Sequence, residues 1–331
     1  MKKYSRRHVL RHVLRLSAGA AMLPALPSLV LAQAYPTRIV KLVVGFPPGG
    51  GADAVSRIIA SRLSEMWGQQ VVVENKPGAG SNLALDNVAN AAPDGYTIIM
   101  SVRAPGLSRF LFSSLSYDPD SFAPVSRIGT YTHMLVAPKD HPAKTMAEFI
   151  AHAKANPGKV TFASPGVGTP SHLTAELLKT RGGFEMTHVP YRGVAAGAMS
   201  DLIAGRIDAM INTTGSLLQS ARGGQVRGLA VTAGQRSALA PEFPTMAESG
   251  VAGFDISSWY GLFMPGKTPP EIVRKINADM VTMLAEEQAK TRLAPLGIVA
   301  ASSTPEQLAT EAKAETELWG PVIKAANIKG D

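Results

Sequence analysis

The chain of 331 residues contains no cysteine. This absence excludes disulfide bonds, cysteine nucleophiles and cysteine-ligated metal sites. Beyond residue 34 the sequence also lacks any apolar run long enough to span a bilayer. What the chain does contain is two loops of small residues that follow apolar runs, and the inference of function depends on them.

The first 34 residues contain basic side chains and no acidic one. An apolar segment, Leu16–Leu31, follows the basic start, and Ala32-Gln33-Ala34 then forms an A-x-A cleavage pattern. This is the layout of a secretory signal peptide, and the Arg6-Arg7 pair resembles a twin-arginine signal. The alternative is an uncleaved membrane anchor, against which Pro24 and Pro27 argue. We therefore expect cleavage after Ala34 and export to the periplasm.

The formal charge of +8 is mostly a property of this leader, since removing its six cations leaves +2. The basic isoelectric point is therefore no argument for a nucleic-acid partner. The 297 residues that remain of the 331 are enough for two domains, each with its own core.

Apolar runs alternate with helical patterns along most of the chain. The predicted strands are Ile39–Gly45, Gln70–Glu74, Thr97–Ser101, Val160–Ala163, Thr187–Val189, Ile207–Ile211 and Val226–Val231. The predicted helices are Ala52–Trp67, Asn82–Ala91, Thr145–Ala155, Ser171–Lys179, Ala195–Ala204, Glu271–Ala285 and Glu306–Ala326. Thr-Pro pairs at 169–170, 268–269 and 304–305 are typical of capped helix starts. This alternation predicts an α/β fold with parallel sheets covered on both faces.

Two extended stretches interrupt the alternation, Phe122–Pro138 and Phe254–Pro265. In a two-domain α/β protein, such a pair of long strands can cross between the domains. This predicts a discontinuous first domain, residues 35–137 plus 256–331, and a second domain of residues 138–255. Closure about such crossings is the expected response to a ligand.

A glycine triplet, Gly49–Gly51, lies between the first predicted strand and the first predicted helix. The stretch fits the degenerate dinucleotide pattern G-x-G-x-x-A, but Asp53 places a negative charge where a phosphate needs positive potential. No Gly-Lys-Ser/Thr follows the triplet, which excludes a Walker loop at this position. Bare amides at a helix start still favour an anion, including a carboxylate. A plain capped turn remains the alternative from the loop alone, with Asp53 as its cap.

A second loop of the same kind, Ser164–Thr169, connects the strand at Val160–Ala163 to its helix. It offers hydroxyls and glycine amides at another helix start. Two such loops on two domains can hold a molecule with two carboxylates.

Several longer stretches resemble the Bug-type solute receptors of tripartite tricarboxylate transporters. They are "YPTRIVKLVVGFPPGGGADAVSRIIA", "VVVENKPGAGSNLALDNVANAAPDGYTI", "SYDPDSFAPVSRIG", "FASPGVGTPSHLTAELL", "HVPYRG" and "DLIAGRIDAM". The resemblance implies a periplasmic-binding-protein fold of the type II, Venus-flytrap class, with a ligand cleft between two domains. It also implies a small carboxylate ligand, held largely by main-chain amides, hydroxyls and bridging waters. The implied partner is a set of transporter membrane subunits or a sensor kinase. No cofactor, metal or nucleic acid is implied, and we expect a monomer.

The ligand-binding residues expected from the loops and the resemblance fall into three sets. The first wall comprises Phe46, Pro48, Gly49, Gly50, Gly51, Ala52 and Asp53. The second wall comprises Ser164, Gly166, Gly168, Thr169 and His172. Farther along the chain the expected contributors are Arg103, Tyr191, Asp208 and Asn212. The motif at Glu74–Gly80 is interpreted as structural, a turn that places the next helix.

Other constellations were weighed against ordinary structural roles. His172 and Glu176 share a helix face but lack a third metal ligand. Arg192, like Arg103, is a candidate partner for an acidic ligand. Trp259 and Tyr260 are expected to pack in a core rather than to stack on a ligand. The prediction is thus a carboxylate receptor without enzymatic activity, and the alternative is an exported hydrolase on the same scaffold, recognisable by a nucleophile–base pair in its cleft.

Overall fold

The computed structural model describes residues 35–193, 197–237 and 239–330, and it shows a mixed α/β fold. Residues from Pro36 onward form one compact unit, to which the description below refers. The predicted signal peptide and its cleavage site lie outside the described residues. Within the described part, no helix has both the length and the apolarity needed to cross a membrane.

Ten strands form one continuous sheet. Their bounds are β1 Val40–Val44, β2 Val71–Asn75, β3 Thr97–Ser101, β4 Phe122–Pro138, β5 Thr161–Ser164, β6 Thr187–Pro190, β7 Ala209–Thr213, β8 Val226–Val231, β9 Ser257–Pro265 and β10 Ile298–Ala300. The order along the sheet is β2-β1-β3-β9-β4-β7-β5-β6, and β8 and β10 also pair with β4. The strands β1 to β3 are mutually parallel, as are β5 to β7, whereas β4, β8 and β9 form antiparallel pairs. The sheet is therefore mixed, and only its two outer parts have the parallel pairing predicted from strand–helix alternation.

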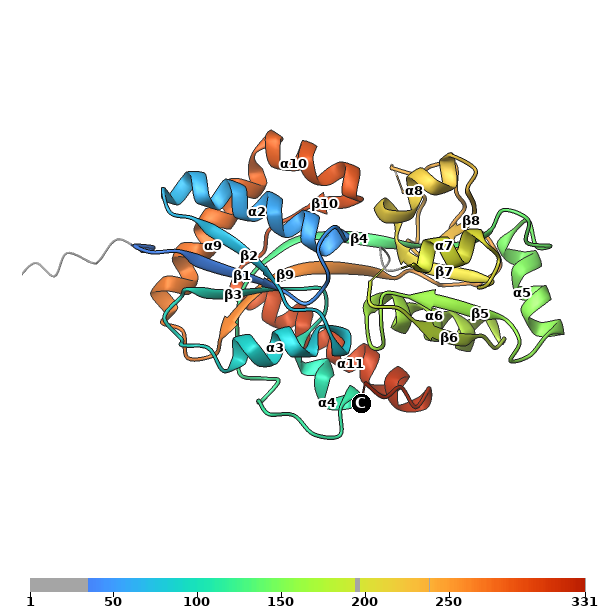
Figure 1. Cartoon of the computed structure of the whole chain (residues 1–331), viewed down its shortest axis with the longest axis horizontal. Helices are drawn as coiled ribbons and strands as arrows, with labels where there is room; N and C mark the ends of the chain where they lie inside the picture. The colour runs from blue at the N-terminus through green and yellow to red at the C-terminus, as the bar shows by residue number, and fades with distance from the viewer. Residues whose placement is uncertain (1–34, 194–196, 238, 331) are drawn as a thin grey trace, which may run out of the picture. The chain divides into compact units, whose positions relative to one another are not determined.

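The two long strands join these outer parts, as Figure 1 shows. The first segment of β4, up to Thr132, pairs with β9, and the segment from His133 pairs with β7 and β8. We call β1–β3, β9, β10 and the beginning of β4 the first strand group, and β5–β8 with the end of β4 the second. The extended stretch Phe122–Pro138 was predicted with the observed bounds.

Helices cover both groups. Their bounds are α2 Gly51–Trp67, α3 Asn82–Ala89, α4 Ser108–Leu111, α5 Met146–Ala155, α6 Pro170–Gly182, α7 Ala198–Ile203, α8 Thr214–Arg222, α9 Pro270–Ala285, α10 Glu287–Leu293 and α11 Pro305–Ala325. Short 3₁₀ turns span Ala79–Ser81, Pro105–Leu107 and Ala294–Leu296. Each predicted helix overlaps an observed one. The helix predicted at Ala195–Ala204 overlaps α7, and residues 194–196 lie outside the described residues. The sequence did not predict α4, α8, α10 or β10.

Two of the three predicted threonine caps are present. Thr169 accepts a hydrogen bond from the amide of His172, and Thr304 forms a full capping box with Gln307. The cap predicted at Thr268 is wrong, because α9 begins at Pro270 and Pro269 is therefore in the cap position. The hydroxyl of Thr268 donates instead to the carbonyl of Pro265.

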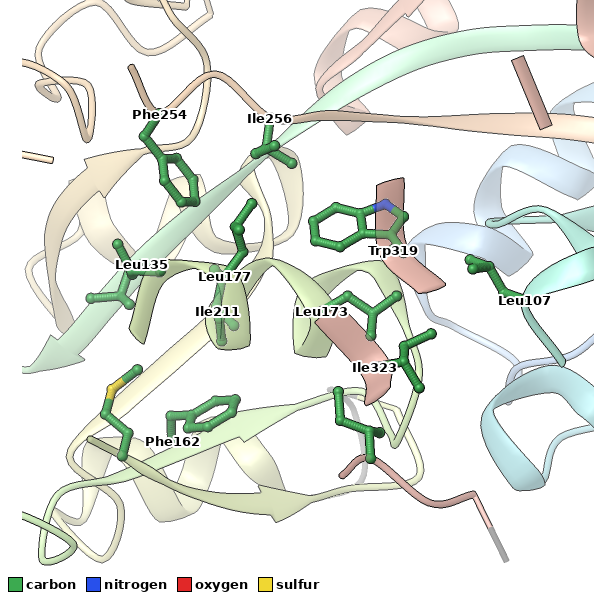
Figure 2. Close-up of a cluster of buried hydrophobic side chains, with 14 of the residues drawn as sticks. Leu107, Leu135, Phe162, Leu173, Leu177, Ile211, Phe254, Ile256, Trp319 and Ile323 are labelled. Carbon is green, nitrogen blue, oxygen red and sulfur yellow. The ribbon is translucent and has the colours of Figure 1, made fainter. Parts of the chain in front are cut away.

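Alternation along β4 divides the core. Met134 and Val136 face one cluster, which includes residues of α7 and α8, while Leu135 and Ala137 face another, which includes residues of α5 and α6. The second cluster extends into the first strand group. Figure 2 shows Leu173 and Leu177 of α6 in the same cluster as Trp319 and Ile323 of α11.

Candidate functional site

A cavity of about 440 Å³ lies between the two strand groups. Its described lining contains small, hydroxyl-bearing and apolar residues from both groups. They are Phe46, Pro47, Pro48, Gly49, Gly50, Gly51, Ala52, Ala54, Val102, Tyr131, Pro165, Thr169, Pro170, Ser171, Arg192, Gly193, Met199, Asn212, Thr213, Gly215, Ser216, Ser220, Tyr260, Leu296 and Ile298. This volume lies in the range of small-molecule sites.

The glycine triplet forms the turn into α2, and each glycine has a different local role. Gly49 has a φ of +83°, a conformation that favours glycine. Gly50 is the N-cap residue, in an extended conformation and without a side-chain cap. The first helical hydrogen bond runs from the amide of Ala54 to the carbonyl of Gly50. The amides of Gly51 and Ala52 therefore have no acceptor within the helix, and both residues line the cavity.

Asp53 accepts a hydrogen bond from this loop and is absent from the described cavity lining. It is 3% exposed. One carboxylate oxygen accepts from the Gly49 amide at 3.0 Å and from Arg57 Nε at 2.9 Å, and the other accepts from Asn75 Nδ2 at 3.0 Å. Burial alone raises the pKa of Asp53, but these hydrogen bonds more than compensate and hold it below its ordinary value. The structure thus places Asp53, an expected ligand residue, with both carboxylate oxygens accepting hydrogen bonds from the protein, one of them from the Gly49 amide.

A second helix start contributes to the cavity at α6. The Thr169 hydroxyl caps the helix, and Pro170 in the first turn has no amide hydrogen. Thr169, Pro170 and Ser171 all line the cavity. The amide of Ser171 lies in the first turn of α6, before the first helical hydrogen bond from Leu173 to Thr169. It therefore has no acceptor within the helix and can donate into the cavity.

A third helix start, that of α8, was missed by the sequence analysis. Its N-cap residue Thr213 makes no capping bond, and its side chain contacts the hydroxyl of Ser216 at 2.5 Å. Thr213, Gly215 and Ser216 line the cavity. The signal available in the sequence was a third succession of strand, small polar residues and helix, of which the sequence analysis used only Asn212.

The charge of the cavity comes from these helix starts and from one side chain. Arg192 is the charged residue of the described lining, and no acidic residue occurs there. Its side chain is exposed. The neighbouring backbone is fixed by hydrogen bonds from Tyr191 N to Ser164 O and from Gly193 N to Pro165 O. Three helix N-termini and one guanidinium give the cavity a positive potential that favours anions.

Two tyrosines form part of the cavity wall. The rings of Tyr131 and Tyr260 are stacked, with centroids 4.5 Å apart. Burial raises the pKa of Tyr260, so its hydroxyl stays a neutral hydrogen-bond donor. Trp259 packs in the core as expected, and Tyr260 is buried as well but also lines the cavity.

Half of the expected ligand-binding residues are brought together at this cavity. They are Phe46, Pro48, Gly49, Gly50, Gly51, Ala52, Thr169 and Asn212. The other half are absent from the described lining, namely Asp53, Arg103, Ser164, Gly166, Gly168, His172, Tyr191 and Asp208. Four of these residues make contacts within the protein, as follows.

Arg103 is buried, and its guanidinium donates to the Ala104 carbonyl and the Ser108 hydroxyl, whereas its neighbour Val102 reaches the cavity. Burial lowers the pKa of Arg103. Asp208 accepts from the amide and the hydroxyl of Thr161, at the opposite end of the second strand group.

Tyr191 donates from its hydroxyl to Asp201 at 2.6 Å. His172 accepts from the Gly168 amide at 3.1 Å through Nδ1, so it fixes the loop before α6. Its Nε2 is 3.7 Å from Glu176, which also pairs with Lys179 at 2.8 Å.

One contact was not anticipated. Ser164 Oγ lies 2.7 Å from His188 Nε2, a serine–histidine pair beneath the second wall. Burial and the adjacent His172 lower the pKa of His188 to about 3, so the ring is neutral. Ser164 is 1% exposed and also exchanges hydrogen bonds with the backbone of Gly166.

The sequence also contains a match to the phosphate-loop motif, which the structure does not support. Residues 261–268 read Gly-Leu-Phe-Met-Pro-Gly-Lys-Thr, which matches the Walker spacing. Gly261 to Pro265 lie within β9 and pair with β3 and β4. An extended strand cannot wrap its amides around a phosphate, so this match is coincidental.

Comparison with known proteins gives a consistent result. The family described as "Tripartite tricarboxylate transporter family receptor" matches residues 55–328. The UPF0065 protein in the tcbD-tcbE intergenic region of Pseudomonas sp. (strain P51) is 41% identical over 293 residues, covering 88% of this chain and 87% of that protein.

Solved structures agree with this similarity. The periplasmic binding protein BugD has a TM-score of 0.82 and 32% identity, covering 89% of this chain and 99% of BugD. Rpa4515 of R. palustris, solved with adipate, has a TM-score of 0.83 and 34% identity, with coverage of 89% and 99%.

Proposed function

Because the chain belongs to the tripartite tricarboxylate transporter receptor family of Bug-type solute-binding proteins, we propose that it captures a small carboxylate in the periplasm. The observation that carries this proposal is the convergence of three helix N-termini, those of α2, α6 and α8, on one cavity. Free amides at helix starts bind carboxylates through hydrogen bonds and through the helix dipole.

The ligand class proposed is a di- or tricarboxylate or a related organic acid. The helix starts of α2 and α8 face each other near the Tyr260 hydroxyl, while Arg192 and the start of α6 provide other positive positions on the lining. Apolar side chains, including Phe46, Val102 and Met199, line the remainder. This distribution suits a molecule with separated carboxylates and an apolar middle, and Rpa4515 was solved with such an acid.

We also propose the two-domain organisation, with residues 35–137 plus 256–331 as one domain and 138–255 as the other. The change of pairing within β4 between Thr132 and His133 supports a crossing close to this boundary. Closure about β4 and β9 would enclose the ligand. The proposed signal peptide would deliver a monomer starting at Tyr35, and the partner would be either transporter membrane subunits or a sensor kinase.

The direct test is a calorimetric titration of unfolded and refolded protein, since refolding removes any ligand that co-purifies. Adipate and hexanoate are matched probes, because they share a six-carbon chain and differ in the second carboxylate. We expect saturable adipate binding, and a stabilisation of about 2.7 kcal/mol when adipate is at a hundred times its dissociation constant. A refolded protein that binds neither these acids nor a panel of other organic acids would contradict the proposal.

An exported hydrolase is the second candidate, and the Ser164–His188 pair is the observation that favours it. Against it, the serine is buried and neither residue belongs to the described cavity lining. Incubation of the pure protein with carboxylic esters and amides decides between the two. Turnover that Ser164→Ala abolishes would establish the hydrolase.

A further inference from the structure

The motif at Glu74–Gly80, interpreted from sequence as a simple turn, contains the most unusual backbone of the described residues. Four consecutive residues have positive φ angles: Gly78 at 139°, Ala79 at 46°, Gly80 at 55° and Ser81 at 78°. Alanine and serine rarely adopt this conformation. Such strain persists only where the surrounding structure enforces it, and it is concentrated at functional elements.

The turn is packed tightly on both sides. A Cβ atom at Gly45, which directly follows β1, would overlap the side chain of Ser81, so the turn requires a glycine at position 45. On its other side, a Cβ atom at Gly80 would overlap the carbonyl oxygen of Val167. Val167 belongs to the loop between β5 and α6, in the second strand group, so the turn makes a direct contact between the two groups.

The same loop is held from a second direction. Gly168, with a φ of +69°, packs against Leu111 at the end of α4, and a Cβ atom there would overlap the leucine side chain. Leu111 is fully buried in the shared core. Val167 and Gly168 are thus held between the strained turn and α4, both of which belong to the first strand group.

These two residues immediately precede the cavity wall. Thr169, Pro170 and Ser171 follow them in the chain and line the cavity. The Gly168 amide also donates to His172, which links the held segment to the first turn of α6. A displacement of the Val167 carbonyl would therefore move the start of α6, which presents its free amide to the ligand.

We propose that Gly80 is a positioning residue for ligand capture, and that the turn Gly78–Ser81 braces the second wall of the cavity from the first strand group. The proposal rests on the function proposed above, because it takes the start of α6 as part of the carboxylate site. Gly80 itself does not touch the ligand. It acts through Val167 and Gly168, and the strained conformation is what brings the backbone of the two groups into contact.

The test compares Gly80→Ala with Gly68→Ala. Gly68, the C-cap of α2, has a similar φ of +61°, and a Cβ atom there would meet nothing within 4 Å. Both substitutions carry the cost of alanine in a left-handed conformation, but only the one at Gly80 collides across the groups. We expect Gly80→Ala to weaken adipate binding about tenfold or more, the effect of losing one hydrogen bond to a charged ligand. Gly68→Ala should bind as the wild type does.

Amide hydrogen exchange on the unliganded proteins gives a readout that needs no ligand. Exchange at residues 166–173 should accelerate in Gly80→Ala and remain unchanged in Gly68→Ala. If the wild type binds no carboxylate, the proposed function fails. The exchange measurement still tests whether the turn Gly78–Ser81 holds the loop before α6. Equal exchange and equal affinity in the two variants would overturn it.

A second pair protects the test against a folding failure of Gly80→Ala. Leu111→Ala removes the side chain that holds Gly168, whereas Leu85→Ala removes an equally buried leucine of the same core, on α3. Both should destabilise the protein, but only Leu111→Ala should also weaken adipate binding and accelerate exchange at residues 166–173. Similar effects of both leucine variants on binding would contradict the brace.

Discussion

The glycine triplet permits a comparison between neighbouring residues that separates cavity space from backbone conformation. Gly51 is the first residue of α2. A Cβ atom on it would lie 3.5 Å from Ser216 Oγ and 3.6 Å from the Tyr260 hydroxyl, so an added methyl group would stand inside the cavity without colliding with the protein. At Gly50 the backbone is extended, with φ of −82°, and a Cβ atom would meet only the Pro47 carbonyl at 3.7 Å.

Gly51→Ala should therefore weaken carboxylate binding while leaving the fold intact. The methyl group would keep a carboxylate from the amides at the start of α2. The loss of one hydrogen bond to a charged group costs about 1.5–3 kcal/mol, which is roughly a ten- to hundredfold increase in the dissociation constant. Gly51 lies within the first turn of the helix, so the unfolding free energy of Gly51→Ala should stay level or rise by about 0.4–1 kcal/mol. Alanine is less favourable than glycine at an N-cap, so Gly50→Ala should lower the unfolding free energy by up to about 1 kcal/mol.

Calorimetric titration with adipate and urea unfolding measure the two quantities on the same preparations. Gly50→Ala is the neighbouring comparison. Gly50 also lines the cavity, but its Cβ atom would meet only the Pro47 carbonyl, so its affinity should fall less than that of Gly51→Ala. An unchanged affinity in Gly51→Ala would refute the placement of a carboxylate at the start of α2. A loss of folding in Gly51→Ala would refute the geometry from which the methyl position was derived.

The remaining predictions concern charge. Asp53→Ala should weaken adipate and hexanoate by a similar factor, because its carboxylate positions the loop and does not touch the ligand; a selective loss of one acid in titration would contradict this role. Arg192→Gln should weaken adipate about tenfold and hexanoate much less, while Lys313→Gln, an exposed charge removed elsewhere, should change neither; equal losses for the two acids would refute a charge-selecting role. Burial lowers the pKa of both His133 and His188 to about 3, so the unfolded chain binds more protons between about pH 3 and 6.5, and stability should fall as the pH drops through that window. His133→Leu should reduce the slope of unfolding free energy with pH by up to about 1.4 kcal/mol per pH unit, and an unchanged slope in urea unfolding would show that this ring is protonated in the folded state.

Local sequence patterns predicted the elements that depend on neighbouring residues. Strands, helices and the caps at Thr169 and Thr304 follow from hydrophobic periodicity and from short-range hydrogen bonds, and these are present. The cap at Thr268 failed because two prolines, Pro269 and Pro270, follow it, and the helix begins at the second. Prediction of α8 failed because its small polar start resembles a loop until its position beside the cavity is known.

The roles of charged residues depended on contacts between distant segments. Asp53 and Asn75 are 22 residues apart, and only the pairing of β1 with β2 brings them within hydrogen-bonding distance. By sequence, Arg103 was an expected ligand-binding residue and Arg192 only a further candidate. The fold buries the first in the core and leaves the second exposed at the cavity.

The sequence by itself determined the family, the succession of elements and the two glycine-rich loops that face the cavity, because each of these is encoded in contiguous residues. The tertiary structure alone decided which side chains reach the cavity, that a third helix start joins the first two, and that the turn at Gly78–Ser81 contacts the loop before α6. The physical reason is that burial and hydrogen bonding are set by segments far apart in the chain. From the sequence alone, an aspartate whose carboxylate accepts hydrogen bonds from its own loop cannot be told apart from one that is available to a ligand.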